Sequence, residues 1–185
     1  MEISSFPYKR INVIGTTSSG KSTLASALGM RLAIPYIELD ALYWNPNWVG
    51  TDDETFREKV ETAVRSSRWV VAGNYSRVRN LIWSKAEAIV WLDYPFSVVF
   101  WRLLTRTVRR AVTQEELWNG NREKFWWHLK LWSDESLFKW LFKTYWRRKR
   151  EIPLQLQQHG YQHLKVFHFK SPRETEGWLD SLAVQ

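Results

Sequence analysis

Residues 15–22 read Gly-Thr-Thr-Ser-Ser-Gly-Lys-Ser, which is a glycine, four residues and then Gly-Lys-Ser. A mostly β-branched run, 11–14, precedes this segment, and the stretch 22–32 that follows carries leucine at every fourth position. A strand that enters a tight glycine turn and leaves as a helix directs several backbone N–H groups, and the positive end of the helix dipole, at one point. The segment is therefore predicted to be a phosphate-binding loop.

In such a loop the lysine, here Lys21, reaches the β- and γ-phosphates of a nucleoside triphosphate, and the Ser22 hydroxyl coordinates Mg²⁺. The residues expected to contact the nucleotide are Gly15, Thr16, Thr17, Ser18, Ser19, Gly20, Lys21, Ser22 and Thr23.

Short apolar runs and helical patterns alternate along the rest of the chain. The runs typical of buried strands are 10–14, 36–39, 69–72, 88–92 and 164–169. The helical stretches are 21–32, 52–66, 96–112, 123–150 and 174–182. This alternation predicts an α/β domain whose parallel sheet is covered by helices on both faces. Ligands of such sheets bind at the carboxyl ends of the strands, so the residues that follow the five runs should converge.

The composition limits the class of protein. A chain of 185 residues with 44% hydrophobic residues suits one domain, 1–185, with a sizeable core. There is no cysteine, so disulfides and thiolate metal sites are excluded, and the four histidines have no metal-ligand spacing. No stretch reaches the roughly 18 uncharged apolar residues of a membrane span, and residues 1–10 lack an apolar signal core. We therefore expect a cytoplasmic protein.

The positive charge is concentrated in one segment. Residues 102–150 hold thirteen Lys and Arg against five Asp and Glu, which equals the whole net charge of +8. Six of the thirteen tryptophans lie there too. Such a segment suggests a surface for anionic ligands, either a membrane or DNA. We favour a helical lid or insert at about 102–150, whose aromatic side chains pack on the domain and whose basic ends reach solvent. Within it, residues 147–150 are the most exposed candidates for a phosphate backbone.

Several segments resemble the small adenylate-kinase-like P-loop proteins of bacteria, some of which are named DNA topology modulation protein. These segments are the phosphate-binding loop and residues 37–44, 73–77, 90–95 and 117–123. The resemblance covers about residues 10–179. It implies a P-loop NTPase fold of the nucleoside-monophosphate-kinase type, with the five parallel strands in the order 2-3-1-4-5. It also implies ATP binding and phosphoryl transfer.

One departure from that family concerns the metal. Adenylate kinases have an Asp-Gly pair after the third strand, and the aspartate helps to hold Mg²⁺ through water. The pair here is Ala72-Gly73, so a carboxylate must come from elsewhere. Asp40 and Asp93, which follow the second and fourth strands, are the candidates. The alternative for Asp93 is a cap on the helix that starts near Phe96.

The acceptor is expected to lie near Asp40. In related small-molecule kinases an aspartate at this point binds the acceptor or assists its deprotonation, which requires hydrogen-bond reach of the hydroxyl. A phosphate acceptor would need arginines instead. The resemblance assigns acceptor binding to Asn74 and Arg77 as well. The alternatives are a loop cap for Asp40 and plain surface charge for Arg77.

A row of arginines follows the fourth strand. Arg102, Arg106 and either Arg109 or Arg110 fall at helical spacings on one face. In adenylate and shikimate kinases, arginines from this helix and from the lid stabilise the transferring phosphoryl group. The resemblance assigns this role to Arg106, Arg110 and Arg122, and the alternative is a solvated basic face.

The loop 113–122 contains Asn119-Gly120-Asn121, which we interpret as the hinge of a lid that closes on the substrates. Arg173, in the loop after the fifth strand, is expected to border the adenine, as in related kinases.

These features predict an ATP-dependent, Mg²⁺-requiring kinase of a small molecule, which could be a nucleotide. The alternative is a nucleic-acid-associated nucleoside triphosphatase without a small acceptor. A signalling GTPase is disfavoured because the chain has no Asn-Lys-x-Asp guanine motif.

Overall fold

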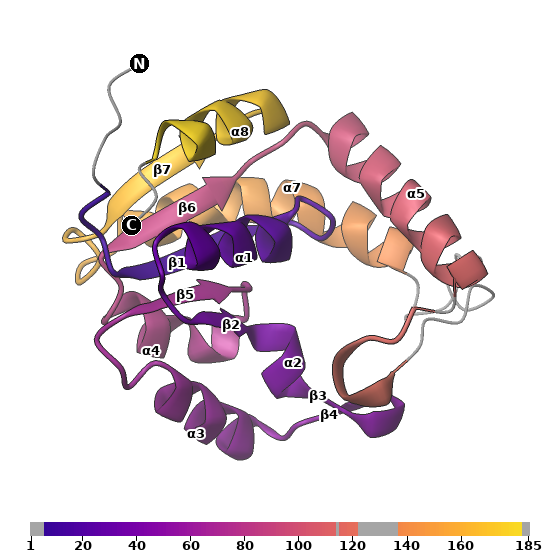
Figure 1. Cartoon of the computed structure of the whole chain (residues 1–185), viewed down its shortest axis with the longest axis horizontal. Helices are drawn as coiled ribbons and strands as arrows, with labels where there is room; N and C mark the ends of the chain where they lie inside the picture. The colour runs from indigo at the N-terminus through magenta and orange to yellow at the C-terminus, as the bar shows by residue number, and fades with distance from the viewer. Residues whose placement is uncertain (1–5, 114, 122–136, 183–185) are drawn as a thin grey trace.

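The computed structural model describes residues 6–113, 115–121 and 137–182. Its centre is a five-stranded parallel sheet in the order β2-β5-β1-β6-β7 (Figure 1). The strands are β1 Arg10–Gly15, β2 Tyr36–Glu38, β5 Trp69–Ala72, β6 Ala88–Leu92 and β7 Lys165–Phe169. Numbered along the chain these five strands run 2-3-1-4-5, so the predicted fold and strand order are confirmed.

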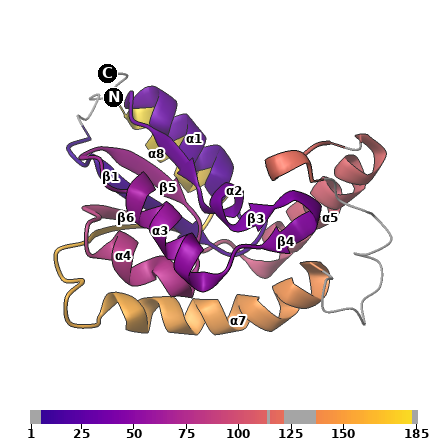
Figure 2. The ribbon, with the colours of Figure 1, turned by 90° about the horizontal axis from the view of Figure 1, so that it is seen from below.

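Helices cover both faces of the sheet. Figure 2 shows α1 (Lys21–Arg31) and α8 (Pro172–Ser181) on one side, and α7 (Leu137–Leu156) running along the opposite side. Two further helices, α3 (Asp53–Ala63) and α4 (Arg79–Trp83), pack with the sheet through a second core cluster that includes Ile152 of α7. β1 is therefore buried from both sides, and its carboxyl end opens where α1 begins.

The second strand ends earlier than predicted. β2 stops at Glu38, and the next residues form the short helix α2 (Leu39–Tyr43), so Asp40 lies in the first turn of a helix. Leu39 is fully buried because it packs against Gly73 at the end of β5. A Cβ at Gly73 would lie 2.7 Å from the Leu39 side chain, and its φ of +140° also favours glycine.

The stretch 41–50, which we predicted to be a loop, contains ordered structure. After α2 come β3 (Trp44–Asn45), the 3₁₀ turn η1 (Pro46–Trp48) and β4 (Val49–Gly50), and the two strands pair antiparallel. We call residues 44–50 the tryptophan hairpin. The buried Thr51 ends it, because both its backbone N–H (2.8 Å) and its hydroxyl (2.7 Å) donate to the carbonyl of Tyr43.

The remaining elements are η2 (Ser76–Val78), α5 (Phe96–Thr113) and η3 (Trp118–Gly120). α7 continues six residues beyond the predicted end at Arg150 and includes Pro153. The first part of the predicted helix 123–150 lies outside the described residues, as does Arg122. Among the described helices, none has both the length and the apolar character that a bilayer crossing requires.

The closing helix α8 starts at Pro172, two residues before the predicted start at Glu174. Ser171 caps it by accepting from the backbone N–H of Glu174, and proline at the first helical position costs no hydrogen bond.

Candidate functional site

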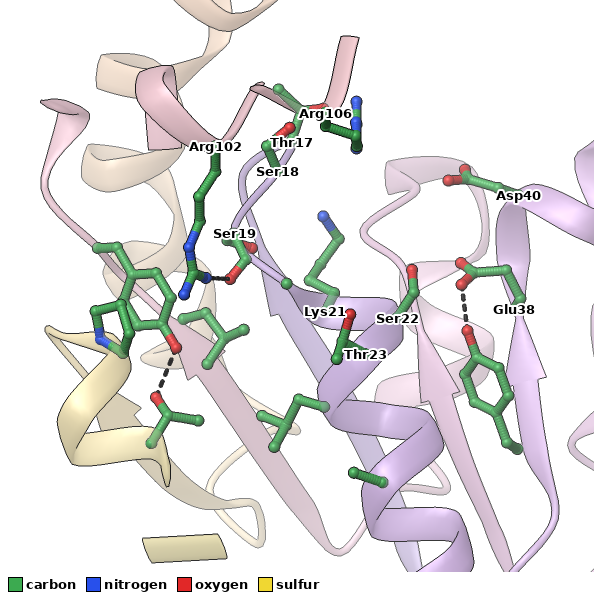
Figure 3. A pocket seen from close by; sticks show the side chains of 18 of the residues that line it. Thr17, Ser18, Ser19, Lys21, Ser22, Thr23, Glu38, Asp40, Arg102 and Arg106 are labelled. Carbon is green, nitrogen blue, oxygen red and sulfur yellow. Dashed lines mark hydrogen bonds between the residues drawn. The ribbon is translucent and has the colours of Figure 1, made fainter. Parts of the chain in front are cut away.

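The predicted phosphate-binding loop connects β1 to α1 at the carboxyl end of the sheet. Gly20 caps α1 with a φ of +96°, a left-handed conformation that glycine adopts without steric cost. The loop borders a cavity of about 810 Å³, shown in Figure 3. Residues 17–23 line this cavity, whereas Gly15 and Thr16 lie just outside its lining.

Lys21 is half-buried at the base of the cavity. Its ammonium donates a hydrogen bond to the carbonyl of Thr16 at 2.8 Å. Burial lowers the pKa of Lys21 to about 8, the nearby charge of Arg148 adds to this effect, and the charge of Asp40 opposes it. In the free protein, burial thus disfavours the charged form of the ammonium. The negative charge of a bound phosphate would favour that charged form.

A carboxylate lies beside Ser22, but it is Glu38, which the sequence analysis missed. In Figure 3 the Glu38 side chain points toward Ser22 and accepts a hydrogen bond from the Tyr36 hydroxyl. Burial raises the pKa of Glu38, and interactions with the hydroxyls of Ser22 and Tyr36 oppose that shift. The available signal in the sequence was a second carboxylate, Glu38, at the carboxyl end of the second strand, where ligands of such sheets bind.

Asp93 has other contacts. Its carboxylate accepts a hydrogen bond from His168 Nε2 at 3.0 Å and lies 3.3 Å from the ammonium of Lys149. The Asp93 side chain is 10% exposed, and it is not part of the cavity lining. The role in metal binding that we predicted for Asp93 therefore receives no support from its position, whereas Glu38 lies beside the predicted metal ligand Ser22.

Asp40 lines the cavity, as predicted for a residue that contacts the acceptor. One of its oxygens, Oδ1, accepts a hydrogen bond from the Tyr75 hydroxyl at 2.5 Å. Burial and the charge of Asp40 raise the pKa of Tyr75, so this hydroxyl keeps its proton and acts as the donor. The other oxygen of Asp40 has no hydrogen-bond partner among the described residues and can accept from an acceptor hydroxyl.

Arg148 of α7 approaches this pair. Burial lowers the pKa of its guanidinium, and the charges of Asp40 and Tyr75 oppose that shift. We predicted residues 147–150 to be an exposed group that touches a phosphate backbone. Arg148 differs from Arg147 and Arg150, because it is only partly exposed and its charge acts on the cavity.

The arginines of α5 divide into two groups. Arg102, Arg106 and Arg110 line the cavity, as their four-residue spacing predicts. Arg102 donates to the carbonyl of Ser19 in the phosphate-binding loop at 3.2 Å. Arg109 points elsewhere, is 68% exposed and pairs with Glu115 at 3.1 Å. Three cations from one helix face thus line the same cavity as Lys21.

Three predicted ligand contacts are not brought to the cavity. Arg77 forms an ion pair with Asp53 at 2.6 Å and does not line the cavity. Asn74 lies beyond the end of β5, outside the lining. Arg173 is exposed, although its neighbours Pro172 and Thr175 line the cavity.

No protein-family model and no curated protein matches the sequence. Solved structures do match over nearly the whole chain. A gluconokinase from Sinorhizobium meliloti 1021 is 21% identical, with 97% of this chain and 95% of that chain covered and a TM-score of 0.50. A shikimate kinase from Aquifex aeolicus vf5 is 16% identical, with 92% and 91% covered and a TM-score of 0.53. A shikimate kinase from Bacteroides thetaiotaomicron is 15% identical, with 94% and 95% covered and a TM-score of 0.53. The chain therefore has the fold of the small P-loop kinases.

Proposed function

We propose that this chain is an ATP-dependent kinase that transfers the γ-phosphoryl group to a hydroxyl group of a small molecule. The observation that carries the proposal is the carboxylate of Asp40 in the same cavity as Lys21 and Ser22. A carboxylate within reach of an acceptor hydroxyl accepts its proton as the oxygen attacks phosphorus. The new P–O bond forms at that oxygen, ADP leaves, and the proton moves to Asp40.

The loop fits the phosphates of ATP. The hydroxyls of Thr16, Ser18 and Ser19 are buried and have no hydrogen-bond partner within the described part of the chain. A buried hydroxyl without a partner costs about 1–3 kcal/mol, so a ligand that offers acceptor oxygens stabilises this loop. Lys21 and the N-terminus of α1 supply the positive potential that phosphates require.

The site also fits Mg²⁺. The Ser22 hydroxyl and the Glu38 carboxylate are adjacent oxygen donors, and Mg²⁺ prefers one or two protein oxygens together with phosphate and water. A Mg²⁺ ion held by Ser22 and Glu38 would offset the negative charge of the β- and γ-phosphates. We therefore assign the metal-organising carboxylate to Glu38.

The arrangement favours an alcohol over a nucleoside monophosphate as the acceptor. A phosphate acceptor requires arginines that face it and no base. The arginine predicted for that role, Arg77, is held by Asp53 and does not line the cavity. The carboxylate of Asp40 lines the cavity, and a carboxylate suits an acceptor hydroxyl better than an acceptor phosphate.

Replacing Glu38 by glutamine should weaken the dependence on Mg²⁺. Glutamine keeps the size and the acceptor oxygen but removes the negative charge, so we expect the Mg²⁺ concentration for half-maximal turnover to rise at least about tenfold. The measurement is a Mg²⁺ titration of ATP turnover, with Glu58→Gln on the exposed face of α3 as the matched control. An unchanged Mg²⁺ requirement in Glu38→Gln would contradict the assignment.

Removing Arg106 or Arg110 should slow the chemical step more than it weakens ATP binding. Contacts that strengthen as charge develops on the transferring group lower kcat when they are lost. We expect Arg106→Ala and Arg110→Ala to lower kcat at least about tenfold with a smaller change in the KM for ATP. Arg109→Ala, from the exposed side of the same helix, is the control and should retain turnover. Equal kinetics in all three variants would show that Arg106 and Arg110 do not contribute to phosphoryl transfer and form only a solvated basic face. The same role for Arg122 stays a prediction, since that residue lies outside the described part of the chain.

The second candidate is a nucleic-acid-associated nucleoside triphosphatase, the function suggested by the name DNA topology modulation protein. One observation favours it: α7 exposes Trp140 and Trp146, which are 43% and 57% exposed, next to Lys143 and Arg147. Exposed aromatic rings beside cations are typical of surfaces that bind single strands.

One experiment separates the two functions. ATP consumption is measured across sugars, nucleosides, small alcohols and nucleoside monophosphates, each with and without DNA. The kinase predicts turnover that depends on an alcohol and a phosphorylated product detected by mass spectrometry. Turnover that depends on DNA and yields only ADP and inorganic phosphate would support the alternative and overturn the kinase.

A further inference from the structure

The helix that carries Asp40 is too short to keep its position without support. α2 has five residues, and isolated helices shorter than about 12 residues are marginal in water. The carbonyls of its last turn also lack partners within the helix and must find them elsewhere. Leu39 anchors only the first residue of α2, through its contact with Gly73. The orientation of Asp40 therefore depends on contacts that other segments make with the end of α2.

Asn119 of η3 makes such a contact. Its side-chain amide donates to the carbonyl of Ala41, the residue after Asp40, at 3.3 Å, and to the carbonyl of Trp44 at 2.5 Å. Trp44 is the residue that ends α2. The φ of Asn119 is +57°, a left-handed conformation that asparagine tolerates better than most residues do. One side chain from a distant part of the sequence thus bonds both to the helix and to the residue that ends it.

Asn121 fastens the tryptophan hairpin, which follows α2 directly in the chain. Asn121 is 3% exposed, and its side-chain oxygen accepts from the backbone N–H of Trp48 at 2.8 Å. Its side-chain nitrogen donates to the carbonyls of Asn45 at 2.9 Å and Trp118 at 2.8 Å. Trp48 has a φ of +57°, which bulky residues adopt rarely, so this bond supports a backbone that needs it. Asn121 therefore holds the hairpin against η3.

The turn η3 itself borders the site. Trp118 lines the cavity together with Asp40, whereas Asn119 and Asn121 are not part of the lining. We interpreted Asn119-Gly120-Asn121 as the hinge of a lid, whereas in the structure both asparagine side chains fasten η3 to the segment that follows Asp40. The two asparagines are therefore placed to act on the chemistry through Asp40, without touching a ligand in the cavity.

We propose that Asn119 and Asn121 are positioning residues, which hold α2 and the hairpin so that Asp40 stays within hydrogen-bond reach of the acceptor hydroxyl. This inference rests on the proposed kinase function. A general base acts only at hydrogen-bond distance from the proton that it takes, and a displacement of about 1 Å can lower a rate about 10²-fold. Tyr75 holds one carboxylate oxygen of Asp40 but does not fix the backbone of α2. The asparagines supply that second restraint.

The first test measures the restraint itself. Asn119→Gly keeps a residue that adopts a positive φ but removes the amide, and with it both hydrogen bonds to α2 and its end. We expect the N–H of Trp44, which donates to the carbonyl of Asp40, to exchange with solvent at least about tenfold faster. Asn80→Ala, exposed on α4, is the control and should leave this exchange unchanged. Unchanged exchange in Asn119→Gly would overturn the proposal.

The second test measures catalysis. Asn119→Gly and Asn121→Ala should each lower kcat with the best acceptor at least about tenfold, while the KM for ATP stays within about threefold. Asn121 is buried, so a thermal melt shows whether Asn121→Ala still folds, and the exposed Asn119 provides the test if it does not. Asn80→Ala should retain turnover. A kcat equal to that of the parent in Asn119→Gly would overturn the proposal.

A double-mutant cycle distinguishes positioning from a general loss of structure. Residues that act through one group have effects that do not add. In an Asp40→Asn background, Asn119→Gly should change kcat by less than about threefold, because the carboxylate that Asn119 positions is already absent. A fall of the same size in both backgrounds would show that Asn119 supports the fold without acting through Asp40, and it would overturn the proposal.

The outcomes also separate this inference from the kinase proposal. If Asp40→Asn lowers kcat but the variants of Asn119 and Asn121 do not, the positioning role is wrong and the kinase proposal stands. If ATP consumption yields no phosphorylated alcohol with any acceptor, the kinase proposal fails and this inference fails with it.

Discussion

Lys21→Met should lower ATP affinity or turnover at least tenfold, about 1.4 kcal/mol. The substitution removes the ammonium at the base of the cavity but keeps a flexible side chain of similar length. Within the described part of the chain that ammonium donates one hydrogen bond, to the Thr16 carbonyl, so the fold should persist. Isothermal titration with a non-hydrolysable ATP analogue measures the affinity, and a thermal melt checks the fold.

The position of Lys21 also sets the sign of a pH effect on ATP binding. With a pKa of about 8 in the free protein, the ammonium is charged below that pH and loses its proton above it. Bound phosphates favour the charged form, so above pH 8 ATP binding takes up a proton and the affinity falls as pH rises, by at most about tenfold per unit.

Two variants check the pH effect. Lys21→Met should lack the decline in affinity above pH 8, because it has no group to protonate. Lys165→Met, at the start of β7 and exposed, should retain the decline of the parent. A parent affinity that stays constant from pH 7 to 10, or an identical decline in Lys21→Met, would contradict the placement of Lys21 against the phosphates.

The parts of the fold that the sequence predicted correctly depend on local rules. The phosphate-binding loop needs glycine at positions of positive φ, Gly15 and Gly20, and a helix that starts directly after Gly20. The strands β5 and β6 have the predicted bounds, 69–72 and 88–92, because every residue in them is buried and the apolar runs are continuous. The order of the strands came from the family resemblance, since pairing between distant strands leaves no local pattern.

The parts that the sequence did not predict depend on contacts between distant residues. Glu38 became the last residue of its strand because Leu39 packs against Gly73, 34 positions away, and starts a helix. The packing of α7 leaves Arg148 partly buried, close enough for its charge to act on Lys21 and Asp40, whereas its basic neighbours are exposed. In a run of four basic residues, the sequence alone does not show which of them faces the domain.

Polar partners explain why two of the predicted site residues, Asp93 and Arg77, lie outside the cavity lining. Asp93 follows a strand at the catalytic edge, but His168 and Lys149 lie against its carboxylate. Arg77 follows the neighbouring strand, but Asp53 at the start of α3 pairs with it. Both residues have the type and the position along the chain that the chemistry requires. Only the packing of β7, α7 and α3 shows that their charges are used for other contacts.

Asp40→Asn should lower kcat about 10²–10⁴-fold, the usual contribution of a positioned general base, with little change in the KM for ATP. Asparagine has the same size and still accepts the hydrogen bond of Tyr75, but it cannot take the proton of the acceptor hydroxyl. The acceptor KM should rise less than kcat falls, because the side chain still offers one polar contact. Single-turnover kinetics with the best acceptor measures the chemical step directly.

Two further variants show whether Asp40 acts as a base or only as part of the structure. Tyr75→Phe removes the hydroxyl that holds Asp40 Oδ1 at 2.5 Å, so we expect a smaller fall in kcat, about tenfold, because the carboxylate remains but its orientation is lost. Asp180→Asn, on the surface of α8 with 76% of its side chain exposed, is the matched control and should retain full turnover. A kcat in Asp40→Asn within threefold of the parent would show that the hydroxyl loses its proton without this carboxylate. Asp40 would then only position the acceptor, in contact with Tyr75 and under the charge of Arg148, and phosphoryl transfer would depend on the cations around the phosphate-binding loop.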